Sequence, residues 1–201
     1  MEIPPGTVNP ARRDAAALTF LASRRSRPPK LLAAPAPDRA ALREILTIAA
    51  RVPDHGKLEP WRFVVLEKPA LERLADEAAV FAATHLLPEE IAAKGVSQFA
   101  QSPLCVALIA VPRPTEKVPA IEQTLSVGAA GMQLLNAALA AGWGASWLTG
   151  WVAHDLRFAA PALGLAEGEW VAGLIHIGTE TAPPPERPRP DLDTLLTWVN
   201  A

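Results

Sequence analysis

The segment "IEQTLSVGAAGMQLLNAALAAG" (residues 121–142) must be buried on every side if it forms the helix that its Ala- and Leu-rich composition indicates. It is apolar on nearly every face, with small residues at Ser126 and from Gly128 to Gly131. A helix that is apolar all round is stable only when it is covered all round. Two arrangements meet this requirement: a fully buried core helix of a monomer, or an interior helix shared between two subunits. Both remain open at this point.

The rest of the chain alternates between helix-like and strand-like patterns without a strict βαβ rhythm. The run "LCVALIAV" (104–111) shows no alternation, which is typical of a strand buried on both faces, and "RFVVLE", "ASWLTGW" and "WVAGLIHIG" are further strand candidates. Helices are expected at residues 10–24, after Asp38 as an N-cap, and after Lys68 with Pro69 in the first turn. We predict an α+β fold in one domain, residues 1–201, with residues 1–9 as a frayed tail.

Charge and cysteine content exclude several functions. The chain has 19 Lys and Arg against 21 Asp and Glu, and its basic residues are spread along the sequence, so no nucleic-acid partner is expected. Cys105 is the single cysteine, which rules out an internal disulfide. The N-terminus has prolines and an early acid where a signal peptide has basic residues and an apolar run. We expect a cytoplasmic protein with no transmembrane segment and no membrane partner.

Two adjacent arginines stand at the end of the first expected helix, in "SRRSRPP" (23–29). Arg24, Arg25 and the hydroxyl of Ser26 suit a phosphate monoester, because guanidinium groups offer paired donors to phosphate oxygens. The alternative is that these arginines are solvated charges at a helix C-terminus, where basic residues are common.

The stretch "RVPDHGKLEPWRF" (51–63) carries more polar groups than a turn requires. Arg51, His55, Lys57 and Glu59 are grouped between an expected helix and an expected strand, so they could line a heterocycle that has carbonyl groups and ring nitrogens. The alternative is a polar turn with Trp61 packed into the core. No two histidines have the spacing of a metal site, so no metal is expected.

The remaining candidate is "PPPERPRPD" (183–191), an extended, stiff segment from which Arg187 and Arg189 project. Taken alone it is typical of a solvated tail. The common catalytic motifs are missing: there is no G-x-S-x-G, Walker loop, C-x-x-C, or G-x-G-x-x-G after a strand. We therefore name no catalytic side chain.

Together these segments resemble the nitroreductase family of flavin enzymes, in particular its short branch with a Pro-Asp-His turn. The resemblance extends over residues 18–191, and its markers occur in the family's order: "SRRS", "RVPDHGKLEPWRF", "EQTLSVGAAGMQLLNAALAAGWGASWLTG", and "GLIHIGT" followed by an Arg-Pro segment. It implies an α+β fold with a central mixed sheet flanked by helices. It also implies an obligate homodimer with FMN at the subunit interface.

The resemblance further implies roles for individual residues. Arg24, Arg25 and Ser26 match phosphate and ribityl contacts, and Arg187 matches a basic residue that closes on the phosphate. Arg51 and His55 match positions that contact the flavin. The isoalloxazine ring is expected to lie against the backbone of Trp147, Leu148 and Thr149. The stretch associated with nicotinamide nucleotide binding comprises Ala137, Ala138, Leu139, Ala140, Ala141 and Gly142.

One departure concerns the flavin edge. Much of the wider family has an Asn-x-Gln-Pro-Trp turn, whereas this chain has Lys57 and Glu59 in the Asn and Gln places. A lysine near the ring would favour the anionic reduced flavin, because it places positive charge where negative charge develops.

The expected function is that of an FMN-dependent NAD(P)H oxidoreductase. NADH or NADPH would reduce the flavin by hydride transfer and leave, and a nitroaromatic, a quinone or a similar electron-poor acceptor would then take the electrons. A flavin carries the electrons itself, which fits the lack of an acid-base pair. Two alternatives remain: an FMN-binding protein with a storage or non-nicotinamide role, and a cofactor-free dimeric interaction protein.

Overall fold

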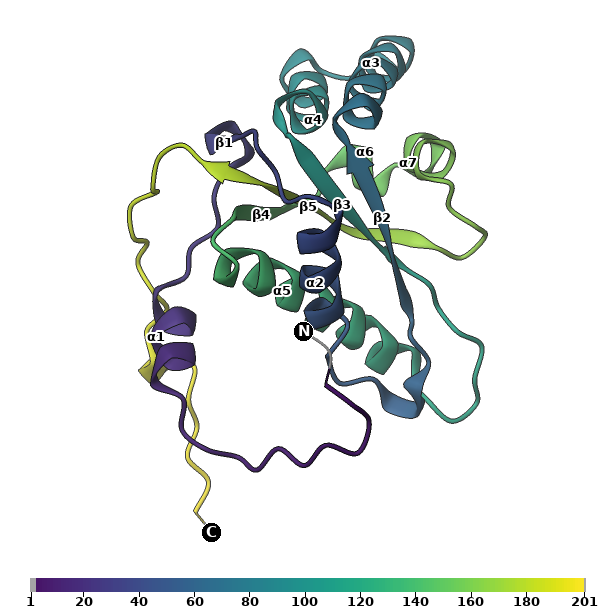
Figure 1. Ribbon diagram of the computed structural model, residues 1–201. Coiled ribbons are helices and arrows are strands. Elements are labelled where there is room, and N and C mark those ends of the chain that lie inside the picture. Colours follow the sequence, from purple (N-terminus) through teal and green to yellow (C-terminus); the bar gives the residue numbers. More distant parts are fainter. Residues whose placement is uncertain (1–2, 201) are drawn as a thin grey trace.

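The structure is a computed structural model and describes residues 3–200. Its centre is a five-stranded sheet with the order β1-β5-β3-β2, in which β4 also pairs with β5 (Figure 1). The strands are β1 (Leu32–Ala33), β2 (Trp61–Glu67), β3 (Leu104–Ala110), β4 (Gly144–Leu148) and β5 (Trp170–Glu180). The α-helices are α1 (Ala15–Ser23), α2 (Arg39–Ala49), α3 (Lys68–Thr84), α4 (Glu89–Gln101), α5 (Ala120–Ala140), α6 (Trp151–His154) and α7 (Leu156–Leu163).

The sheet is antiparallel between all neighbouring strands of the described chain, so the expectation of a mixed sheet is wrong. The reason lies in the connections. Two helices, α3 and α4, join β2 to β3 and return the chain to the end of the sheet that it left, so β3 runs opposite to β2. The pair α6 and α7 does the same between β4 and β5. The single helix α5 makes β3 and β4 run in the same direction, but β5 lies between them.

Helix starts follow the sequence in most places. Asp38 caps α2 by accepting a hydrogen bond from the Ala41 N–H at 2.8 Å, and Pro69 lies in the first turn of α3, as predicted. The helix expected from residue 10 begins only at Ala15, because the carboxylate of Asp14 acts as its N-cap. The apolar residues near the C-terminus stay exposed, with only a 3₁₀ turn at Leu192–Thr194.

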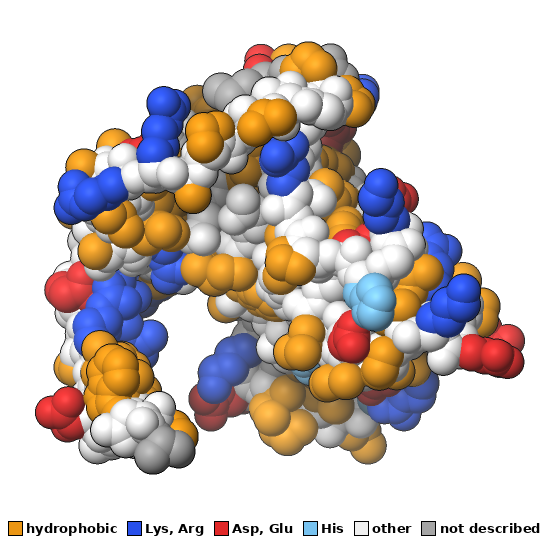
Figure 2. Space-filling view, turned by 90° about the horizontal axis from the view of Figure 1, so that it is seen from below, with side chains coloured by type: hydrophobic (Ala, Val, Ile, Leu, Met, Phe, Trp, Pro, Cys, Tyr) orange, Lys and Arg blue, Asp and Glu red, His pale blue; other side chains and the backbone are white. Residues whose placement is uncertain are grey.

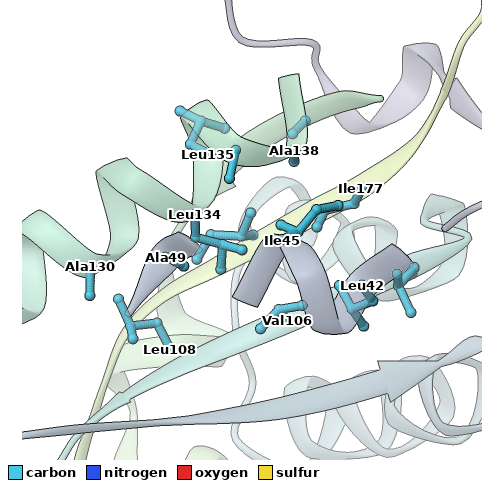
Figure 3. Packing of buried hydrophobic residues seen from close by; sticks show 14 of the residues in the cluster. Leu42, Ile45, Ala49, Val106, Leu108, Ala130, Leu134, Leu135, Ala138 and Ile177 are labelled. Carbon is cyan, nitrogen blue, oxygen red and sulfur yellow. The ribbon is translucent and has the colours of Figure 1, made fainter. Parts of the chain in front are cut away.

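Two apolar clusters cover the two faces of the sheet. On one face, Ile45 of α2 and Leu134 of α5 pack against Val106 of β3 (Figure 3). On the other face, helices α3, α4, α6 and α7 contribute residues such as Leu74 and Phe158. Every residue of β3 is buried, which confirms the prediction of a strand covered on both sides.

Helix α5 is buried on one side only. Leu134 on its inner side is fully buried, whereas Ile121 and Leu125 are 62% and 65% exposed and Met132 is 38% exposed. The alternative in which this segment is a fully buried core helix of a monomer is therefore wrong. This chain leaves an apolar strip of α5 uncovered.

Helix α1 and the C-terminal residues form an arm beside the body of the molecule. No residue of α1 is buried. Figure 1 shows α1 and the C-terminal segment at the left, and Figure 2 shows the molecule hollowed between this arm and the body. Within residues 3–200, no helix has both the length and the apolar character needed to cross a membrane.

Candidate cofactor-binding site

The predicted phosphate-binding arginines line a cavity at the end of α5. Its volume is about 280 Å³, and its walls include Arg24, Arg25, Leu139, Gly142 and Trp143. The two arginines come from the segment after α1, and the other three residues come from the end of α5 and the turn before β4. The structure thus brings the basic pair and part of the predicted nicotinamide stretch to one place. Ser26 is next to them in the chain but does not line this cavity.

The Pro-rich segment near the C-terminus lies beside the same arginines. Arg25 donates from Nε to the carbonyl oxygen of Pro185 at 3.2 Å. A hydrogen bond from the Arg187 N–H lowers the pKa of Glu186, and the charges of Arg189 and Arg25 contribute to the same shift. Arg187 therefore lies in a segment that is held next to Arg25.

Arg27 is a member of this basic group that sequence analysis did not name. Its N–H donates to the carbonyl oxygen of Ala145 at 2.8 Å, and its side chain pairs with Glu180. Burial lowers the pKa of Arg27, and the nearby charges of Arg25 and Arg24 lower it further. The signal was in the sequence, since Arg27 is the third arginine of "SRRSRPP".

The outer edge of β4 borders the same region. Ala145 uses its carbonyl oxygen to bond Arg27 on the side away from β5. Backbone groups alternate sides along a strand, so the N–H and C=O of Trp147 point to that same outer edge. The Trp147 indole packs inward and donates from Nε1 to the Ala172 carbonyl oxygen at 3.2 Å. Leu148 follows at the end of β4, and the carbonyl oxygen of Thr149 accepts a hydrogen bond from Gln98.

The polar turn before β2 has an unusual backbone. Gly56, Lys57 and Glu59 all have left-handed φ angles, of 73°, 53° and 48°. Residues other than glycine rarely adopt this conformation, and such strain concentrates at functional sites. The carboxylate of Asp54 holds the turn by accepting hydrogen bonds from the Leu58 and Glu59 N–H groups at 3.2 and 2.8 Å. Trp61 is half-buried against the core. The packing of Trp61 is therefore compatible with polar residues of the same turn lining a binding site.

His55 in this turn contacts the start of α5. Its Nδ1 lies 2.7 Å from Oε2 of Glu122, and the Ser126 hydroxyl donates to the Pro53 carbonyl oxygen at 2.6 Å. Arg51 follows the end of α2 and is exposed. Sequence analysis missed Glu122, and no pattern could have found it, because the pair joins residues that are far apart in the chain.

The predicted site residues form two separate groups in one chain. His55 is bonded near the start of α5, whereas the cavity with Arg24 and Arg25 lies at its end, beside Leu139. At about 1.5 Å per residue, Glu122 and Leu139 are about 25 Å apart along the helix axis. A single chain does not bring the two groups together.

The predicted nicotinamide stretch is divided among different surroundings. Ala138 is fully buried in the core. Ala137, Ala140 and Ala141 line an apolar cavity of about 560 Å³ between α1, α2 and α5. Leu139 and Gly142 line the arginine cavity, and Gly142 has a φ of 88°. In the described part of the chain, no three His, Cys, Asp or Glu side chains gather where a metal ion could be held.

Comparison with known proteins assigns the chain to a family. Residues 21–179 match the family described as "Nitroreductase family". The Haemophilus influenzae protein named "Putative NAD(P)H nitroreductase" is 39% identical over 166 residues, covering 81% of this chain and 88% of that protein. The chain belongs to the nitroreductase family. The membership in this family of oxidoreductases that the sequence indicated is thereby confirmed.

A further relative supports the nitroreductase assignment, and two solved structures have the same fold. The Escherichia coli K12 protein "Putative NAD(P)H nitroreductase YdjA" is 32% identical, covering 81% of this chain and 87% of that protein. A nitroreductase-like family protein from Bacillus cereus has the same fold, with a TM-score of 0.77 at 20% identity, over 96% of this chain and all of that one. A Desulfovibrio desulfuricans "putative nitroreductase in complex with fmn" has a TM-score of 0.72 at 20% identity, over 94% of this chain and all of that one.

Proposed function

We propose that this nitroreductase-family protein is an FMN-dependent NAD(P)H oxidoreductase. A reduced nicotinamide and an electron-poor acceptor, such as a nitroaromatic or a quinone, would use the same site in turn. The observation that carries the proposal is the position of Arg24 and Arg25, which line one cavity next to the free edge of β4. This position supports phosphate binding by the two arginines over the alternative of solvated charges at a helix end.

The donors present fit FMN. Two guanidinium groups suit the doubly charged phosphate, and the segment with Arg187 lies beside them. The outward N–H and C=O of Trp147 can bond the polar edge of the isoalloxazine ring, with Leu148 and Thr149 alongside. FMN would supply the transfer of two electrons from the nicotinamide to the acceptor. The protein binds and orients the reactants.

The proposed active form is a homodimer with FMN at the subunit interface. Arg51 and His55 lie at one end of α5 and the arginine cavity at the other, so one chain offers two half-sites. A second copy packed on the uncovered strip of α5 would bring the turn of one subunit to the arginine cavity of its partner. It would also cover Ile121 and Leu125, which removes an exposed apolar patch from water.

The nicotinamide is proposed to approach near the end of α5. Ala140, Ala141 and Gly142 present small side chains there, which allows a flat ring to come close to the backbone. Lys57 is proposed to favour the anionic reduced cofactor through its charge. A cytoplasmic location is part of the same proposal.

An absorption spectrum of the freshly purified protein tests the function, repeated without oxygen after NADH or NADPH is added. Flavin bands that bleach on addition are the expected result. Bands that persist would favour an FMN-binding protein with another role. A protein that stays colourless after incubation with FMN would contradict both and would favour an interaction protein.

A further inference from the structure

The contact between His55 and Glu122 fixes which atoms of the histidine ring are free. Nδ1 lies 2.7 Å from Oε2 of Glu122, and the two side chains are 61% and 43% exposed. A carboxylate can only accept a hydrogen bond, so Nδ1 carries a proton in this pair. Nε2 remains available to another molecule, as an acceptor when the ring is neutral and as an N–H donor when it is charged.

The backbone that carries His55 is fixed by contacts from several elements. Asp54 accepts hydrogen bonds from two N–H groups of the same turn, and Ser126 of α5 donates to the carbonyl oxygen of Pro53. The turn also lies near the loop before α5, since a Cβ atom at Gly56 would be 3.6 Å from Cγ2 of Val118. The strained φ angles of Lys57 and Glu59 persist because these contacts hold the turn. A histidine on such a turn keeps a defined position.

The proposed reaction needs a proton that hydride transfer does not provide. A quinone accepts a hydride, which brings two electrons and one proton, and it becomes a hydroquinone only after a second proton reaches its other oxygen. A nitro group needs protons in the same way when an N–O bond breaks and water leaves. The proposed oxidoreductase activity supplies the hydride, so the open question is which group supplies the proton.

We propose that Glu122 is a positioning residue that holds His55 so that its Nε2–H protonates the acceptor. The N–H bond at Nε2 breaks and a new O–H bond forms on the oxygen of the hydroquinone anion. The ring thereby changes from its charged form, with protons on both nitrogens, to the neutral form with its proton on Nδ1. Because the His55 side chain is largely exposed, water can return a proton to Nε2 before the next turnover. This inference rests on the proposed function, and it assigns a role to Glu122 that the sequence did not suggest.

The first test measures the pair itself and does not depend on the cofactor. ¹⁵N NMR of the flavin-free protein reports which nitrogen of the neutral His55 ring is protonated. We expect Nδ1–H in the wild type and a mixture of both forms in Glu122→Gln, because the glutamine amide can meet Nδ1 with either its oxygen or its nitrogen. A wild-type ring with its proton on Nε2 would overturn the inference.

The second test compares two acceptors with the FMN-loaded protein after reduction by NADH or NADPH. p-Benzoquinone needs a proton, whereas ferricyanide takes only electrons, so the ratio of the two rates isolates the proton step. A general acid contributes roughly 10²–10⁴-fold, and we expect Glu122→Gln to lower the ratio by about tenfold or more. His55→Gln should lower it at least as far, and the double variant no further than His55→Gln alone.

A matched control removes the same charge nearby. Glu116 lies in the loop before α5, and Glu116→Gln should leave the ratio within about twofold of the wild type, since within residues 3–200 His55 forms its ion pair with Glu122 and none with Glu116. An unchanged ratio in Glu122→Gln, or losses that add in the double variant, would overturn the role of Glu122 and leave the oxidoreductase function intact. A protein that reduces neither acceptor would instead overturn the proposed function, and this inference with it.

Discussion

The indole ring of Trp147 occupies the space in which a side chain at Gly131 would lie. Gly131 is in the interior of α5, where alanine in place of glycine normally stabilises a helix by about 1 kcal/mol. Here the added methyl group meets a ring that is held by the hydrogen bond from Nε1 to Ala172. We expect Gly131→Ala to lower the free energy of unfolding by about 1–3 kcal/mol, measured in urea.

A second variant tests whether the indole ring of Trp147 is the cause of this loss of stability. In a Trp147→Phe background the smaller ring should free part of the space, so the cost of Gly131→Ala should fall by about half. Such coupling is expected of two residues in contact. An equal cost in both backgrounds would show that the indole ring does not limit the size of residue 131.

Leu125→Lys tests the proposed dimer. Leu125 is 65% exposed in one chain, so a lysine there should barely change the stability of an isolated subunit. At a subunit interface the same lysine is buried without a partner, and we expect the protein to shift from dimer to monomer in analytical ultracentrifugation. Val80→Lys is the matched control, because Val80 is 67% exposed on α3 and should leave the assembly unchanged. A dimer that survives Leu125→Lys would contradict an interface at this strip.

Arg25→Gln should weaken FMN binding through the phosphate. Hydrogen bonds to charged groups contribute about 1.5–3 kcal/mol, so the dissociation constant should rise by about tenfold or more. Riboflavin lacks the phosphate, and its weaker binding should be nearly the same in both proteins. Titrations that follow flavin fluorescence measure both affinities. Arg73→Gln on α3 should change neither, and an equal loss for riboflavin would indicate that Arg25 acts only through Pro185 and the fold.

Acid should weaken the fold at one identifiable ion pair. Arg62 donates two parallel hydrogen bonds to Glu169, at 2.9 and 2.6 Å, and they lower the pKa of Glu169 from 4.5 to about 2. A carboxyl group whose pKa is lowered on folding stabilises the protein fully above its unfolded pKa. That stabilisation is lost as the pH falls from about 4.5 to 2, and it amounts to at most about 3 kcal/mol.

The variant Glu169→Gln isolates this contribution. Arg62 is 35% exposed, so screening by water should reduce the measured effect to about 1–2 kcal/mol at neutral pH. At about pH 2 and below, the two proteins should have nearly equal free energies of unfolding in urea. Glu67→Gln, which removes a more exposed pair with Arg39, should have little effect at either pH. A difference between Glu169→Gln and the wild type that is constant with pH would contradict the role of the charge.

Local patterns predicted most elements of this fold. Three features depend only on neighbours in the chain: the unbroken apolar run of β3, the N-cap at Asp38, and the small and apolar side chains along α5. Each was found in the expected place. Adjacent residues also gave the basic group around Arg25. The antiparallel pairing was not predicted, because strand direction depends on how many helices return the chain to the sheet.

Contacts between distant segments could not be read from the sequence. The bond from Arg25 to Pro185 and the pair of His55 with Glu122 depend on how the sheet folds the chain back on itself. The placement of the two groups of site residues at opposite ends of α5 also depends on how the sheet folds the chain. Residues at the two ends of α5 can share a site only in a dimer. Their spacing in the sequence therefore cannot show that they belong together unless the arrangement of the subunits is already known.

The position of β5 has a consequence for synthesis on the ribosome. This strand pairs with β1, β3 and β4, yet it is the last strand in sequence order within the described residues 3–200. Strands made earlier therefore wait, with backbone groups unpaired along the edges that β5 will join, until residue 180 has left the exit tunnel. Translation at about 5–20 residues per second makes this an interval of several seconds, in which molecular chaperones would shield the nascent chain from aggregation.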